Sequence, residues 1–176
     1  MRKITFGGAN SLDNFIARTD HGIDWLMWCD EAAEVMKNYW KTVDTILMGR
    51  KTFEVASGNS KRNKNPYPGI KTYVFSRTKH QGKPKSPVFV SEDAAEFVAK
   101  LKSEPGKDIC VMGGGDFAKT LFEAKLIDEI GFNIHPVLLG SGIPLFHDMK
   151  EQINLELMEC RPFQNGCVYV TYRVKH

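Results

Sequence analysis

The sequence predicts an α/β protein with a mostly parallel central sheet and helices on both faces. Three observations support this class. A unit of strand, turn and helix recurs along the first part of the chain, its strands are short and apolar enough to be buried on both faces, and longer β-like segments follow toward the C-terminus.

Short apolar runs that end at turn residues predict the strands of the first part. The stretches between them carry apolar residues at helical spacing, and Ser91 is placed to cap the third helix. The expected strands are residues 3–9, 44–48, 71–75, 88–90 and 108–112, and the expected helices are residues 24–42, 51–56, 92–102 and 117–124. Residues 57–69 have almost no apolar content, so we expect a surface loop there.

The pattern changes after residue 126. Long β-like segments, joined by turns with glycine or proline, cover residues 127–139, 153–161 and 167–175. Segments of this kind indicate strands added antiparallel at the edge of the sheet. Their apolar side chains beside a sheet edge favour a homodimer, in which a second copy covers that edge.

Length and composition indicate a single domain, residues 1–176. The chain has 42% hydrophobic and 26% charged residues, which is ordinary for a globular domain. No apolar run approaches the roughly 20 residues of a membrane span, and the N-terminal stretch is too short and glycine-broken for a signal-peptide core. We therefore expect a cytoplasmic protein with no membrane partner.

Charge and cysteine placement argue against two further classes. A net charge of +3 is too mild for nucleic-acid binding, although the basic residues between Arg50 and Lys85 could face a phosphorylated small molecule. The 4 cysteines are scattered, without a C-x-x-C pair or a His/Cys cluster at metal-ligand spacing. We expect reduced thiols and no metal site.

The turn after the second strand has the parts of an anion site. Gly49 frees the backbone, Arg50 and Lys51 follow, and Thr52 stands where a helix begins. Helix N-terminal amides favour phosphate, and arginine supplies a planar fork of donors. The turn is not a Walker A loop, because Asp44 occupies the position of its first glycine. The alternative, an exposed basic first turn, is unfavourable at that end of the helix dipole.

Similar turns follow two other strands. Ser76, Arg77 and Thr78 come after residues 71–75, which by itself is a weak signal, because solvated loop arginines are common. In right-handed strand-helix-strand units, such turns all lie at the carboxyl edge of the sheet, where open α/β sheets bind ligands. We therefore expect them to converge on one crevice.

Three successive glycines, Gly113, Gly114 and Gly115, form the third turn. Ordering three glycines costs conformational entropy. The close approach of a cofactor to the backbone would explain them, and a tight turn is the alternative. We expect Asp116 to cap the helix that follows. An ordinary Rossmann fingerprint is not supported, because Ala118 replaces the last glycine of G-x-G-x-x-G.

The motifs together resemble the dihydrofolate reductase family in its standard order. The similar segments are ITFGGANSLDNFIA, TILMGRKTFE, TYVFSRT and VMGGGDFAKTLFEAKLIDEI, so the resemblance covers nearly the whole chain. It implies the dihydrofolate reductase-like three-layer fold and a bound NADPH. By this resemblance, the cofactor-binding residues are Ala9, Gly49, Arg50, Lys51, Thr52, Ser76, Arg77, Thr78, Gly113, Gly114, Gly115 and Asp116.

One branch of that family is favoured. Residues 134–146 (IHPVLLGSGIPLF) resemble the C-terminal reductase domain of bacterial riboflavin biosynthesis enzymes, which reduces a ribosylamino-pyrimidine phosphate. Neither a deaminase domain nor its H-x-E zinc motif accompanies the segment, so the resemblance implies a stand-alone NADPH-dependent reductase of the 5-amino-6-(5-phosphoribosylamino)uracil reductase type.

Folate is disfavoured as the substrate. Ile70 stands where the family has an arginine for the folate glutamate, and Ala118 replaces the family tyrosine near the nicotinamide. Two alternatives stay open, a dihydrofolate reductase proper and an NADPH-binding protein without turnover.

Two carboxylates are candidates for the catalytic group. With Trp25 aligned to the family tryptophan, Asp30 falls where folate reductases carry their acidic residue, although an exposed helix carboxylate is an equal alternative. Asp13 lies in SLDN, which resembles the SLDG segment of riboflavin-pathway reductases, with Asn14 in place of the glycine. His135 is expected to be a packed histidine rather than a catalytic base.

Overall fold

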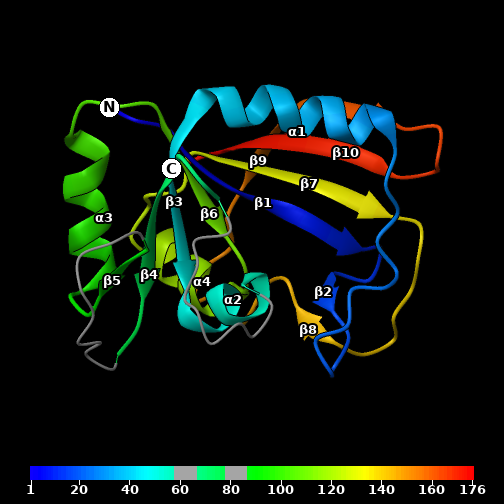
Figure 1. Ribbon diagram of the computed structural model, residues 1–176, viewed down its shortest axis with the longest axis horizontal. Helices are drawn as coiled ribbons and strands as arrows, with labels where there is room; N and C mark the ends of the chain where they lie inside the picture. The colour runs from blue at the N-terminus through cyan, green and yellow to red at the C-terminus, as the bar shows by residue number, and fades with distance from the viewer. Residues whose placement is uncertain (58–66, 78–86) are drawn as a thin grey trace.

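Eight strands form one sheet with a layer of helices on each face (Figure 1). The computed structural model describes residues 1–57, 67–77 and 87–176. In spatial order, the strands are β5 (Val88–Val90), β4 (Lys71–Phe75), β3 (Val43–Gly49), β6 (Asp108–Met112), β1 (Ile4–Ser11), β7 (Glu129–His135), β10 (Val168–Val174) and β9 (Leu155–Pro162). Two short strands, β2 (Phe15–Ala17) and β8 (Ile143–Pro144), pair with each other beyond the end of β1.

The helices complete the three layers that the sequence predicts. On one face lie α1 (Asp30–Thr42) and α2 (Arg50–Ala56), and on the other lie α3 (Ala94–Ser103) and α4 (Gly115–Glu123). Within the described ranges, no helix combines the length and the apolar run that a bilayer crossing demands.

Strand direction departs from the expectation in one place. The C-terminal strand β10 is antiparallel to both of its neighbours, as predicted, but β7 runs parallel to β1. The expectation of an antiparallel strand at residues 127–139 is therefore wrong. Helix α4 carries the chain from β6 back across the sheet, so β7 begins at the same edge as β1, and such a crossover produces a parallel pair.

Two helices begin later than the sequence suggests, and local hydrogen bonds explain both. Helix α1 starts at Asp30 instead of residue 24, because Cys29 is its N-cap and accepts a hydrogen bond at Sγ from the Ala32 amide (3.4 Å). Among the apolar residues before it, Trp25 is buried edge-to-face on His135, whereas Ile23, Met27 and Trp28 are exposed. The cap of α3 is Asp93, whose carboxylate accepts from the Glu96 amide at 2.9 Å, and not Ser91.

The two faces of the sheet differ in chemistry. Toward α3 and α4, the central strands present large apolar side chains such as Ile4, Phe6 and Val111, which form the main core and are fully buried. Toward α1, the same strands present mostly small or polar residues, namely Lys3, Thr5, Gly7, Ala9, Cys110, Glu129, Gly131, Asn133, His135, Tyr169 and Thr171. The middle of helix α1 therefore has no large apolar side chains of these strands to pack against.

Candidate functional site

The three predicted turns lie side by side. Strands β4, β3 and β6 are neighbours and parallel, and their last residues are in register, with Gly49 opposite Phe75 and Met48 opposite Met112. The expected convergence at one carboxyl edge is confirmed. Thr78, which the resemblance assigns to the cofactor, lies outside the described residues.

The turn between β3 and α2 is open to solvent. Gly49 is the N-cap of α2, with no side-chain hydrogen bond to the helix amides, and a Cβ atom there would meet nothing closer than Phe117 Cβ at 3.9 Å. Arg50 and Lys51 are exposed, and Arg50 Nε lies 3.8 Å from the carboxylate of Glu54 one turn on. The amides and both cations are thus accessible to an anion.

The three glycines differ in what a side chain at each position would contact. Gly113 has φ +100°, and a Cβ atom on it would lie 2.0 Å from Thr52 Oγ1. Gly115 has no room either, because its Cβ would lie 2.3 Å from His147 Cδ2. Packing within the chain therefore requires both residues. Gly114 differs, since its Cβ would meet only Ile16 Cδ1 at 3.9 Å, so open space remains beside Gly114 and Gly49.

Asp116 does not cap α4, contrary to the expectation. The helix begins two residues earlier than predicted, with Gly114 as its N-cap, which places Asp116 in the first turn. Its carboxylate is exposed and lies 3.5 Å from His147 Nδ1. At the end of β4, the Ser76 amide donates to the Val90 carbonyl at 2.9 Å, and Arg77 is exposed.

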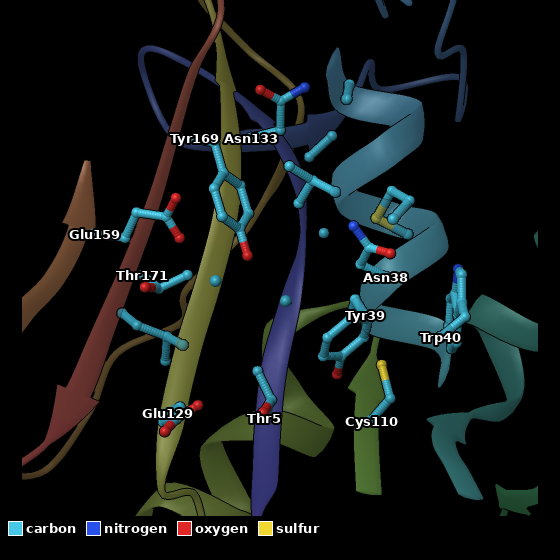
Figure 2. A pocket seen from close by; sticks show the side chains of 18 of the residues that line it. Thr5, Asn38, Tyr39, Trp40, Cys110, Glu129, Asn133, Glu159, Tyr169 and Thr171 are labelled. Atoms are coloured by element: carbon cyan, nitrogen blue, oxygen red, sulfur yellow. The ribbon is translucent and has the colours of Figure 1, made fainter. Parts of the chain in front are cut away.

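A cavity of about 570 Å³ separates α1 from the sheet. Figure 2 shows Asn38 and Tyr39 reaching into it from α1, opposite Asn133, Tyr169, Thr171 and Glu159 from the strands. Met27 and Trp28 border the end of the cavity near Ala9 and Met112. Because Met112 directly precedes Gly113, the cavity reaches the same carboxyl edge as the predicted cofactor turns.

Two small apolar clusters hold α1 above this cavity. Near its C-terminus, Tyr39 and Trp40 pack on a cluster that includes Ile46 and Met48 of β3. Near its N-terminus, Ala32 packs with Phe163 and Cys167. The middle of the helix lies above the glycines of β1 and β7, which have no side chains to fill the space. The cavity therefore follows from the small residues of these two strands.

Several polar groups of the cavity are buried. The Thr5 Oγ1 and Asn133 Oδ1 atoms are buried, Thr5 beside the Tyr39 phenol and the Asn133 amide beside the His135 ring. His135, only 2% exposed, accepts at Nδ1 from the Met27 amide (3.2 Å), and its Nε2 lies 3.3 Å from the Asn133 amide nitrogen. Burial lowers the pKa of the His135 imidazole, so the ring is neutral at pH 7. The expectation that His135 is packed is confirmed, and it also faces the cavity.

The family described as the RibD C-terminal domain matches residues 2–169 of the chain. The chain belongs to this family. It is 35% identical to the YyaP protein of Bacillus subtilis strain 168 over 180 residues, which is 97% of this chain and 94% of that protein. YyaP itself is described as uncharacterized.

Solved structures agree with this membership of the RibD C-terminal domain family. A protein from Shewanella sp. PV-4 assigned to riboflavin biosynthesis superposes with a TM-score of 0.84 at 23% identity, covering 100% of both chains. The deaminase/reductase of Thermotoga maritima gives 0.73 at 15% identity, covering 99% of this chain and 57% of that one. Dihydrofolate reductase from Enterococcus faecalis, complexed with NADP(H), gives 0.68 at 19% identity, covering 99% and 97%. The dihydrofolate reductase-like fold is confirmed, and the family is one of NADPH-dependent reductases that generally bind NADP(H).

The two carboxylates predicted to be catalytic lie in different surroundings. Asp30 is exposed at the first residue of α1 and does not line the cavity. Asp13 accepts hydrogen bonds from Ser11 Oγ (2.6 Å), the Leu139 amide (3.1 Å) and the Gly140 amide (2.8 Å), and the Ser11 bond above all lowers the pKa of its carboxyl. It therefore ties the β1–β2 turn to the loop after β7.

Asn14 adopts a backbone conformation in that turn that glycine adopts freely. Its φ of +65° is the left-handed conformation that asparagine tolerates better than most residues. The SLDN segment therefore makes this turn without a glycine.

The acidic and amide groups of the cavity were missed from the sequence. A signal was present in β7, where Glu129, Gly131, Asn133 and His135 alternate with Ile130, Phe132 and Ile134. A strand inside a sheet that helices cover on both faces is normally apolar on both faces. Polar residues on one face of such a strand indicate a lined cavity.

Proposed function

We propose that this member of the RibD C-terminal domain family is an NADPH-dependent reductase of the riboflavin-pathway type. Its substrate would be a pyrimidine-like or pterin-like ring held in the cavity beneath α1. One observation carries the proposal: Met112 lines the cavity and directly precedes the three-glycine turn. A ring in the cavity and a cofactor on that turn would therefore meet at the ends of β6 and β1.

The residues of the carboxyl edge fit a dinucleotide phosphate cofactor. Exposed cations stand at the start of α2 and after β4, and the N-caps of α2 and α4 are glycines with open space beside them. NADPH would lie against Ala9, Gly49, Arg50, Lys51, Thr52, Ser76, Arg77, Gly113, Gly114, Gly115 and Asp116, with Thr78 the remaining candidate. When bound, this cofactor supplies a hydride.

The cavity residues would position the ring and keep water away from it. Met27, Trp28 and Tyr39 supply apolar surface against a flat molecule. His135 accepts at Nδ1 from the Met27 amide, so its Nε2–H faces the side-chain amide of Asn133, whose oxygen can accept from it. Asp30 and Asp13 stay the catalytic candidates predicted from the sequence, and the turnover numbers of Asp30→Asn and Asp13→Asn would distinguish them.

Steady-state NADPH oxidation tests the proposal. The purified protein is mixed with NADPH and either 5-amino-6-(5-phosphoribosylamino)uracil, its dephosphorylated form or dihydrofolate, with NADH in place of NADPH as the control. Oxidation with either pyrimidine supports the proposal. Turnover with dihydrofolate alone identifies a folate reductase, and tight NADPH binding without turnover on any of them identifies a cofactor-binding protein.

A further inference from the structure

We propose that the cavity beneath α1 accepts an uncharged or cationic ring compound that carries amino groups, and rejects the phosphorylated form of the same compound. This inference rests on the proposed function, because it assigns the substrate class of that site. It departs from the phosphorylated pyrimidine that the resemblance implies.

The charges that line the cavity are mostly negative. Three strands contribute the carboxylates of Asp108, Glu129 and Glu159. Among the described lining residues, Lys3 is the sole lysine or arginine, and its ammonium already lies 3.0 Å from Glu129 and 3.8 Å from Asp108. No cation of the described lining is therefore free to pair with a phosphate.

Glu159 adds an unpaired negative charge at one side of the cavity. It forms no ion pair or hydrogen bond with the described residues, and Figure 2 shows its carboxylate turned toward the cavity beside Thr171. The Glu159 carboxylate is exposed to solvent and lies close enough to act on the phenol of Tyr169. Burial raises the pKa of the Tyr169 phenol, and the charges of Glu159 and Glu129 raise it further.

The polar side chains of the cavity favour a ligand that donates hydrogen bonds. The buried Thr5 hydroxyl and the carboxylates of Glu129 and Glu159 offer oxygens that can accept. An amino group on a ligand ring would satisfy such oxygens, and a protonated one would also be attracted by the carboxylates. A phosphate offers only more acceptors at pH 7.

A phosphate would also lose its hydration on entry. It carries about −1.5 to −2 charges at pH 7, and apolar side chains such as Met27, Trp28 and Phe163 contribute much of the cavity wall. Burying an anion beside like charges is unfavourable when no cation compensates. The apolar walls and the carboxylates therefore both disfavour binding of a phosphorylated ligand.

Equilibrium binding to a matched pair of ligands tests this inference independently of turnover. The probes are 5-amino-6-ribitylaminouracil and its 5′-phosphate, titrated calorimetrically into the full chain with and without NADP⁺. We expect the unphosphorylated compound to bind at least roughly tenfold more tightly. Glu159→Lys should narrow this preference at least roughly tenfold. The control is Glu156→Lys, which makes the same charge change on β9 but at a residue that pairs with Arg173 and does not line the cavity.

The outcomes separate this inference from the proposed function. Preferential binding of the unphosphorylated compound, narrowed by Glu159→Lys and not by Glu156→Lys, supports the inference even if no NADPH is oxidised. In that case the reductase proposal alone fails. Equal or tighter binding of the phosphate, an equal effect of the two lysine substitutions, or no binding of either compound would overturn the inference, whatever the protein does with NADPH.

Discussion

Gly113 and Thr52 are in direct contact across the sheet edge. A Cβ atom on Gly113 would lie 2.0 Å from Thr52 Oγ1 and 2.6 Å from Thr52 Cβ, and the φ of Gly113 is +100°. The turn after β6 thus packs on the first turn of α2, so the two predicted halves of the cofactor edge form one structural unit.

Gly113→Ala should destabilise the protein strongly. The added methyl group overlaps Thr52, and alanine at positive φ is strained, which together cost about 3 kcal/mol. Chemical denaturation measures the loss. Gly114→Ala is the matched control, because its Cβ meets nothing closer than 3.9 Å, so it should change stability by less than about 1 kcal/mol while weakening NADPH binding. Equal stability losses in the two variants would contradict this account of the turn.

Arg50→Ala should weaken NADPH binding without unfolding the protein. A charge-assisted bond to phosphate contributes about 1.5–3 kcal/mol, or roughly 10- to 100-fold in Kd. The exposed pair with Glu54 adds little to stability. Fluorescence titration with NADPH gives the Kd, and Arg18→Ala, an exposed arginine paired with Asp24, serves as the control. If Arg50→Ala binds NADPH unchanged, the phosphate assignment is wrong.

Gly131→Val should close the cavity and spare the cofactor edge. A Cβ atom at this position would make ordinary contacts, 3.4 Å to Thr171 Cγ2 and 3.7 Å to Tyr169 Oη, so the fold tolerates it. The valine methyl groups then occupy the space above the floor. Ligand binding should fall progressively from Gly131 to alanine to valine at constant NADPH affinity. Unchanged ligand binding in the valine variant would place the substrate elsewhere.

His135 should make the protein less stable in acid. Because burial lowers its pKa in the folded state, the unfolded chain binds the proton more readily. The contribution of the neutral ring is fully present above the unfolded pKa of about 6.5 and is lost as the pH falls from there through the lowered folded pKa. Thermal unfolding at pH 7.5 and 5.5 should show a smaller pH dependence for His135→Gln than for the wild type. His176→Gln, at the exposed C-terminus, should leave the dependence unchanged; parallel curves for all three proteins would contradict the assignment.

The homodimer expected from the sequence would use the edge strand β9. Among the described strands it pairs with β10 alone, and it exposes Leu155, Leu157 and Met158. Leu157, 57% exposed, lies near the middle of the edge, so Leu157→Lys should produce a monomer by light scattering after size-exclusion chromatography. Leu138→Lys, at an exposed leucine outside β9, is the control. A monomeric wild-type protein would show that the expectation is wrong.

Local sequence patterns determined most of the elements and the position of the cofactor edge. Strands β4, β5 and β6 have the predicted bounds, because short apolar runs bounded by turn residues have few alternatives. The turn at Gly49 and Arg50 was recognisable because a glycine and a cation at a helix start have a local physical meaning.

Only the tertiary structure decided which groups share a site. The direction of β7 and the packing of the loop before α1 depend on contacts between residues distant in the sequence, such as the Met27 amide with His135. The cavity also depends on tertiary packing. It forms where small residues on β1 and β7 face helix α1, which apolar clusters hold at its two ends. A sequence pattern reports what each segment prefers by itself, whereas packing between segments determines where space is left for a ligand.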